Sequence, residues 1–133
     1  MGLRQHYSEN LNRLYQNILR MGTMVEEALK KALVAISDQD LSLARQVIDE
    51  DIRIDEMQAQ IEDQCVLLIA TEQPVATDLR EIVTAVKIVS NIERIGDHAR
   101  HIARAVGKLK NPAFLATVPK TGPPALPRNR SRI

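Results

Sequence analysis

The chain has 133 residues, the size of one ordinary domain, and its 18 Lys and Arg nearly balance its 17 Asp and Glu. A net charge of +1 gives no electrostatic reason to expect nucleic acid or an anionic membrane surface as the main partner. With two Tyr, one Phe and no Trp, the chain also lacks the platforms on which nucleic-acid bases stack, so its core must be aliphatic.

The sequence favours a cytoplasmic protein over an exported or membrane-spanning one. Cys65 is the only cysteine, so no disulfide can form within the chain, and a reducing compartment fits. The N-terminal residues form no apolar signal segment, and no uncharged apolar run of membrane-spanning length follows. We therefore expect a soluble cytoplasmic protein with no membrane insertion.

Proline divides the chain into two unequal parts. Pro74 is the only proline before residue 112, and the other five lie in the last 22 residues. Because proline cannot continue a helix, long helices are possible over residues 1–110 but not over 111–133. The sequence predicts a helical domain followed by a Pro-rich disordered tail.

Apolar residues in the first part alternate spacings of three and four, the seam of a long bundle helix. The spacing predicts helices over about 3–36, 41–70 and 75–109. Residues 37–40 offer N-cap side chains for the second helix, and Pro74 suits the first turn of the third. Because short connections make neighbouring helices antiparallel, we expect an all-α fold, an antiparallel three-helix bundle.

The third predicted helix is apolar on two sides. One seam begins with four aliphatic residues and continues into Glu93 and Gly96; its aliphatic members are Leu79, Ile82, Val86 and Val89. A second stripe lies roughly opposite and contains Ile88, Ile92, Ile95, Ala99, Ile102 and Val106. A helix that is apolar on two sides is buried on two sides. The pattern indicates either a central position in the bundle or a contact with a second copy of the chain.

Two pairs of carboxylates lie on or beside the apolar seams of the second and third predicted helices. Asp51 and Asp55 are four residues apart, as are Glu93 and Asp97, so each pair leaves one face of its helix. Asp51 falls on the apolar seam, where a carboxylate is costly unless something compensates its charge. A turn centred between residues 72 and 73 brings the four carboxylates within about 5 Å along the bundle axis.

Two kinds of compensation remain open from spacing alone. Hard cations, iron and manganese accept carboxylate oxygens, and His101 lies one turn beyond Asp97 on the better face. Alternatively, basic side chains neutralise the cluster, the nearest along the chain being Arg53, Lys87, Arg94 and Arg100. The sequence has no Gly-rich phosphate loop, no Cys/His zinc spacing and no nucleophile with a placed base. We therefore do not predict an enzyme.

Several segments closely resemble the PhoU family of phosphate transport regulators. The strongest are residues 68–80 (LIATEQPVATDLR) and 92–99 (IERIGDHA), and residues 21–26 and 47–55 match in order. The resemblance covers about residues 3–109. It implies a fold of three-helix bundles, usually two in tandem, each with two Glu/Asp-x-x-x-Asp motifs. These motifs fall here on Asp51 with Asp55 and on Glu93 with Asp97, which the resemblance implies as ligands of iron, zinc, manganese or magnesium.

The resemblance also implies a function without catalysis. Members repress phosphate uptake and phosphate-starvation signalling by coupling a phosphate ABC transporter to a sensor histidine kinase at the cytoplasmic face of the membrane, commonly as dimers. This chain carries one repeat, a single-repeat or truncated form, with the Pro-rich tail where a second repeat would begin. A homodimer through the second stripe of the third helix would rebuild a six-helix shape.

The competing interpretation is a metal-free helical scaffold or adaptor whose bundle surface binds a partner helix. It predicts that Asp51 and Glu93 are paired with Arg or Lys. A truncated regulator without function is a further alternative.

Overall fold

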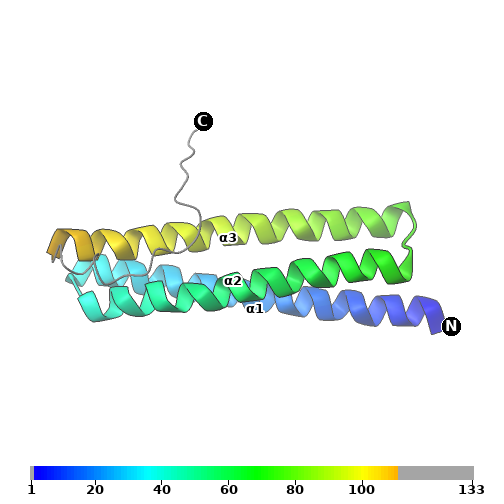
Figure 1. Ribbon diagram of the computed structural model, residues 1–133, viewed down its shortest axis with the longest axis horizontal. Helices are drawn as coiled ribbons and strands as arrows, with labels where there is room; N and C mark the ends of the chain where they lie inside the picture. The colour runs from blue at the N-terminus through cyan, green and yellow to red at the C-terminus, as the bar shows by residue number, and fades with distance from the viewer. Residues whose placement is uncertain (1, 111–133) are drawn as a thin grey trace, which may run out of the picture.

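The computed structural model describes residues 2–110, which form three long helices. They are α1 (Gly2–Asp38), α2 (Leu41–Glu72) and α3 (Ala76–Lys110). Figure 1 shows them side by side along the long axis, with α2 running against α1 and α3, and every pair of helices is in contact. The predicted all-α antiparallel three-helix bundle is confirmed. None of these helices, within residues 2–110, is apolar enough along its length to cross a membrane.

The predicted tail at residues 111–133 lies outside the described residues, as does Met1. The division of the chain into a bundle at 1–110 and a tail therefore stays a prediction. The helices themselves differ from the expected ranges by one or two residues at their ends, and the later end of α2 matters most for the register of α3.

The connection between α1 and α2 is built as the sequence indicates. Asp40 has an extended backbone and accepts a hydrogen bond at Oδ1 from the Leu43 N–H, 3.0 Å away. This side-chain cap satisfies one of the N–H groups that a helix leaves unpaired at its start. Gln39 just before it adopts a left-handed conformation (φ 56°), which turns the chain sharply between the helices.

The connection between α2 and α3 differs from the expectation. Pro74 precedes α3 instead of lying in its first turn, because Val75 is the capping residue. The Val75 carbonyl accepts from the Leu79 N–H at 2.9 Å, and the Asp78 carboxylate accepts from the Val75 N–H. The turn therefore centres on Pro74, and Ile54 of α2 packs level with Gly96 of α3.

The core is aliphatic, as the composition requires. Its largest fully buried side chains come from all three helices and are Leu14, Met21, Val47, Ile61, Ile82, Val89 and Val106. Gly96 is buried where the three helices meet. A Cβ added there would lie 3.4 Å from Val25 Cγ2 and 3.7 Å from Ile54 Cγ2, so its lack of a side chain lets α3 approach both neighbours.

The second apolar stripe of α3 is only partly covered within the bundle, because Ile88 and Ile95 remain 45% and 44% exposed. Ala99 and Val106 are fully buried, Ile92 and Ile102 pack against the core, and Ile92 approaches Gly22 of α1. Part of this stripe thus packs within one bundle, as the first of the two explanations considered from the sequence expects, whereas Ile88 and Ile95 stay on the surface.

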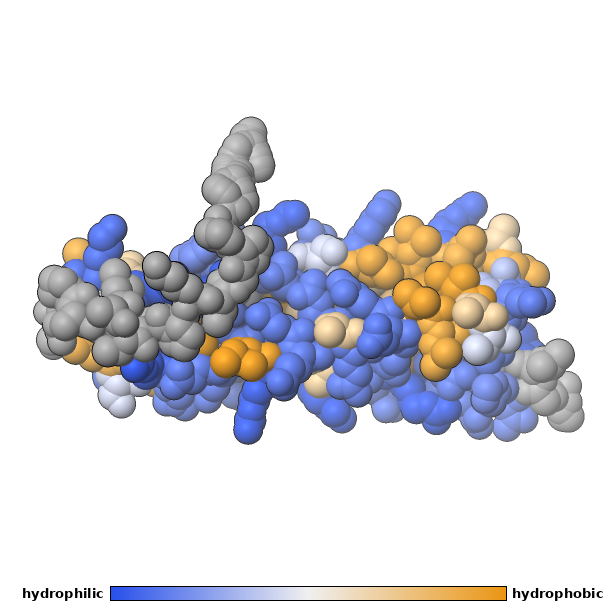
Figure 2. All heavy atoms as spheres, viewed as in Figure 1, coloured by the Kyte–Doolittle hydropathy of each residue, from blue (hydrophilic) through white to orange (hydrophobic). Residues whose placement is uncertain are grey.

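The first seam of α3 departs from the prediction near its start. Leu79 and Val86 are 39% and 38% exposed, and Ala85 is buried with Ile82 and Val89 in their place. The exposed residues join others on α2 to form what we call the turn-end patch: Val66, Ile69, Val75, Leu79, Val83 and Val86. Figure 2 shows apolar surface gathered over the end of the bundle that carries the α2–α3 turn.

Candidate functional site

The four predicted carboxylates lie on the facing sides of α2 and α3. Asp51 is buried at 5% exposure, Glu93 and Asp97 are half-buried, and Asp55 is exposed. The charges of Asp55 and Asp97 raise the pKa of Asp51, and those of Asp97, Asp55 and Asp51 raise the pKa of Glu93. The four side chains are therefore close enough to repel one another; we call them the carboxylate cluster.

Burial and mutual repulsion raise the pKa values of two of these carboxylates towards neutral pH. Burial, and then the charge of Asp55, raises the pKa of Asp51 to about 6. Burial, and then the charge of Asp97 and a hydrogen bond from protonated Glu93 to it, raises the pKa of Glu93 to about 7. Burial also raises the pKa of Asp55. The cluster thus carries more negative charge than its surroundings compensate.

Arg100 supplies part of the missing positive charge. Its Nη1 donates to Asp51 Oδ2 at 3.0 Å, and its Nη2 lies 3.6 Å from Asp97 Oδ1. The guanidinium is only 16% exposed and joins one carboxylate of each pair across the α2–α3 interface. Of the basic residues that spacing nominated, Arg100 is the one that enters the cluster, whereas Arg53 and Arg94 are exposed.

The donor set suits a hard cation, but the side chains do not enclose one. Carboxylate oxygens are the preferred ligands of magnesium and manganese, and iron and zinc accept them as well. Within residues 2–110, no three Asp, Glu, His or Cys side chains are grouped so that they hold a metal ion. His101 is exposed, and partial burial and the charge of Arg100 lower the pKa of its imidazole.

A second buried carboxylate, Asp78, lies at the α2–α3 turn and was not predicted as a long-range partner. Two nitrogens of Arg4 donate hydrogen bonds to the Asp78 carboxylate, at 2.7 Å and 3.1 Å. The Tyr7 hydroxyl donates to the backbone carbonyl of Asp78 at 3.3 Å. The hydrogen bonds and charge of Arg4 lower the pKa of Asp78. The signal that was missed is the parallel alignment of α1 with α3, which brings residues 4 and 7 beside residue 78.

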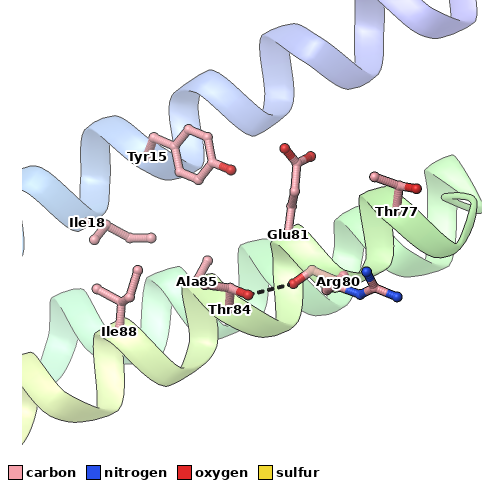
Figure 3. A pocket seen from close by; sticks show the side chains of 8 residues that line it. All are labelled: Tyr15, Ile18, Thr77, Arg80, Glu81, Thr84, Ala85 and Ile88. Carbon is pink, nitrogen blue, oxygen red and sulfur yellow. Dashed lines mark hydrogen bonds between the residues drawn. The ribbon is translucent and has the colours of Figure 1, made fainter.

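A hollow of about 330 Å³ lies between α1 and α3, away from the carboxylate cluster. Figure 3 shows Tyr15 and Ile18 of α1 facing Ala85 and Ile88 of α3 across it. The Thr84 hydroxyl donates back to the carbonyl of its own helix four residues earlier, at 2.9 Å. The walls are mainly apolar, so this hollow offers contact area and not a set of reactive groups.

The sequence matches known proteins over parts of all three helices, including the four residues of the carboxylate cluster. A sequence model of the PhoU domain matches residues 18–106. A phosphate-specific transport system accessory protein PhoU homolog from Clostridium acetobutylicum is 44% identical over 107 residues, which cover 80% of this chain and 49% of that protein. The accessory protein PhoU from Serratia marcescens is 40% identical over 108 residues, covering 78% of this chain and 44% of its own.

A solved structure agrees with these relatives. The crystal structure of PhoU from Pseudomonas aeruginosa has a TM-score of 0.75 and 38% identity, covering 77% of this chain and 49% of that one. The chain spans about half the length of the curated relatives it matches. The names of these relatives describe them as accessory proteins of phosphate-specific transport. Because the PhoU domain match covers more than half of the sequence and both carboxylate pairs, the chain belongs to the PhoU family.

Proposed function

We propose that this protein is a negative regulator of phosphate uptake and of phosphate-starvation signalling, and that it couples a phosphate ABC transporter to a sensor histidine kinase. The observation that carries the proposal is the PhoU domain match over residues 18–106, which contains both carboxylate pairs. A protein with this role works in the cytoplasm at the membrane surface. Long exposed helix faces suit contacts with other proteins better than catalysis.

The carboxylate cluster is the proposed metal site of this regulator. Asp51, Asp55, Glu93 and Asp97 would hold one or more ions of iron, zinc, manganese or magnesium. The raised pKa values of Asp51 and Glu93 support this assignment, because they report negative charge that a cation would neutralise. When bound, the metal supplies positive charge that holds α2 and α3 together at this level.

The homodimer expected from the sequence uses the second stripe of α3, of which Ile88 and Ile95 remain exposed, and we propose that the turn-end patch adds to its interface. Apolar patches of this kind on a surface commonly mark interaction sites. The α2 side of the patch is flanked by exposed Glu62 and Asp63, and the α3 side by exposed Arg80 and Lys87. In a two-fold pairing that lays α2 of one copy on α3 of the other, these opposite charges face each other.

A reporter assay tests the regulatory proposal. In a bacterium that lacks its own PhoU protein and is grown in high phosphate, expression of this chain is expected to lower both a phosphate-starvation reporter and the rate of phosphate uptake. The Asp55→Asn plus Asp97→Asn variant is the matched control, because it removes two charges and keeps the shape of the side chains. A reporter that stays high while the folded protein is present at normal levels would contradict the proposal.

The alternative function, a metal-free scaffold that binds a partner helix, has one observation in its favour. The Arg100–Asp51 ion pair is the neutralisation that this interpretation expects. Glu93, however, interacts mainly with other carboxylates. Metal content of the purified protein separates the two functions, because a scaffold retains no metal at the cluster.

A further inference from the structure

We propose that Arg100 acts as an internal counter-cation that competes with the metal ion for the carboxylate cluster. It holds the cluster in the metal-free protein and has to withdraw when a metal ion binds. This inference rests on the proposed metal function and adds a regulatory element to the same site.

The contacts of Arg100 show what it would obstruct. Its two terminal nitrogens reach Asp51 Oδ2 at 3.0 Å and Asp97 Oδ1 at 3.6 Å, which takes one oxygen from each carboxylate pair. A planar guanidinium can contact two carboxylates at once, so one side chain bridges α2 and α3 as a shared metal ion would. Arg100 therefore occupies the position in which a cation would be most useful.

Electrostatics makes joint occupancy unfavourable. A divalent ion and a guanidinium bound to the same carboxylates would be a few ångströms apart, where like charges repel strongly in a half-buried site. The Asp51 side chain is only 6% exposed, so solvent screens this repulsion weakly. The metal and Arg100 should therefore exclude each other.

The position of Arg100 also allows it to leave. The side chain is mostly buried but keeps 16% exposure, and its long flexible stem can carry the charge into water. Removing Arg100 should thus have opposite effects in the two states. The metal-free protein loses the partner of buried Asp51, whereas the metal-bound protein loses a competitor.

The experiment compares Arg100→Gln with Arg94→Gln, a matched control on the same helix that removes the same charge from an exposed position. Manganese and zinc affinities are measured by calorimetric titration, and melting temperatures are recorded in chelator and in saturating metal. We expect Arg100→Gln to bind metal roughly tenfold more tightly than the parent and Arg94→Gln to stay within about twofold. We also expect Arg100→Gln to melt lower than the parent in chelator but not in metal.

Different results overturn different claims. If the parent binds metal and Arg100→Gln binds it equally or more weakly, Arg100 is a structural partner only, and the metal function survives. If neither the parent nor any variant binds metal, the proposed metal site fails and the competition with it. Metal binding by Arg100→Gln alone would support the competition strongly.

A milder variant and a spectroscopic measurement cover the case in which Arg100→Gln does not fold. Arg100→Lys keeps the charge but cannot bridge both carboxylates, and we expect its metal affinity to exceed that of the parent. In the parent protein, the guanidinium NMR signal of Arg100 should be ordered in chelator and averaged after metal is added. A guanidinium signal that stays ordered with metal bound would contradict the withdrawal of Arg100.

Discussion

Two buried aspartates have pKa values that are shifted in opposite directions. Asp78 at the α2–α3 turn and Asp51 in the carboxylate cluster are buried to almost the same degree, at 4% and 5% exposure. Each accepts a short hydrogen bond from an arginine, 2.7 Å from Arg4 and 3.0 Å from Arg100. Yet the pKa of Asp78 is lowered, and that of Asp51 is raised to about 6.

The difference comes first from burial, which is the largest cause of the raised pKa of Asp51 but is outweighed at Asp78 by the hydrogen bonds from Arg4. It comes second from how many carboxylates share each arginine. Arg4 gives two hydrogen bonds to Asp78 alone, whereas Arg100 divides its charge between Asp51 and Asp97 while Asp55 and Glu93 add further negative charge. A buried carboxylate that is paired with one arginine of its own, as Asp78 is with Arg4, forms a structural ion pair, which we call a clamp. A buried carboxylate that shares one is a candidate ligand, because it still gains from a second cation.

The largest expected effect is on metal content. Asp55→Ala plus Asp97→Ala should reduce bound metal from stoichiometric to none after exposure to iron, manganese, zinc and magnesium. Asp78→Asn, the control from the turn, should leave metal content unchanged because its clamp lies outside the cluster. Elemental mass spectrometry measures both. Equal metal in the parent and the double variant would return the cluster to a purely structural role.

The turn-end patch, and not the carboxylate cluster, should control self-association of the protein. Val83→Asp places a charge in the turn-end patch and should weaken self-association by roughly tenfold or more, since an unpaired interfacial charge must be desolvated. Leu19→Asp changes a similarly apolar residue on α1 that is 71% exposed, and it should have no such effect. Sedimentation equilibrium gives the dissociation constants. A parent protein that is monomeric at high micromolar concentration would refute the dimer.

Neutralising the two aspartates should change stability in opposite directions. At neutral pH in chelator, Asp78→Asn should lower the melting temperature, because it removes the ionised partner of Arg4. Asp51→Asn should be neutral or stabilising by up to about 1 kcal/mol, because the neutral amide no longer repels its neighbours. Denaturant unfolding of both variants at matched pH checks the signs. Destabilisation by Asp51→Asn as large as that by Asp78→Asn would remove the distinction.

The pH dependence should show the same contrast. Because the pKa values of Asp51 and Glu93 are raised in the folded protein, to about 6 and about 7, the folded state holds extra protons above pH 4. Stability in chelator should therefore fall by about 1 kcal/mol as the pH rises from 5 to 8, after allowance for solvent screening. Asp78 acts oppositely, because its lowered pKa adds stability above the ordinary aspartate pKa, and this stability is lost as the pH falls through the lowered value.

Glu93→Gln provides the control for this pH profile. It should flatten the fall between pH 5 and 8 and leave the acid limb unchanged, since Asp78 is intact. Urea unfolding across the pH range measures both limbs. A Glu93→Gln profile that parallels that of the parent would show that Glu93 titrates normally.

Sequence reasoning succeeded where one rule decides the outcome. The three-four spacing of apolar residues and the single early proline were enough to predict the helices, and the four-residue spacing of Asp51 and Asp55 placed both on one face. The register of α3 was harder, because it depends on where the turn centres. Gln73 in a left-handed conformation and Val75 as the cap move that centre to Pro74, and neither residue type announces this role.

The choice of cation was also beyond the sequence. Arg100 was one of several basic residues within reach, and only the packed register selects it for the cluster. Arg4 was missed altogether, because its partnership with Asp78 joins residues 74 positions apart on two helices that are not consecutive. Contacts within a helix or across one turn could be predicted, whereas contacts that depend on the stagger of three helices could not.

The smallest expected effect is that of a substitution at Gly96 of α3. In the sequence Gly96 continues the same seam of the third helix as Glu93. In the structure, a Cβ added at Gly96 would lie 3.4 Å from Val25 and 3.7 Å from Ile54, so the glycine allows close packing of the three helices.

Alanine fits these distances with a small adjustment and removes the cost of glycine in a helix, up to about 1 kcal/mol. Gly96→Ala should thus change the free energy of unfolding by no more than about 1 kcal/mol, towards greater stability, and leave metal affinity as in the parent. A loss of metal affinity at unchanged stability would instead place Gly96 in the site and show that room beside Glu93 matters for the ion.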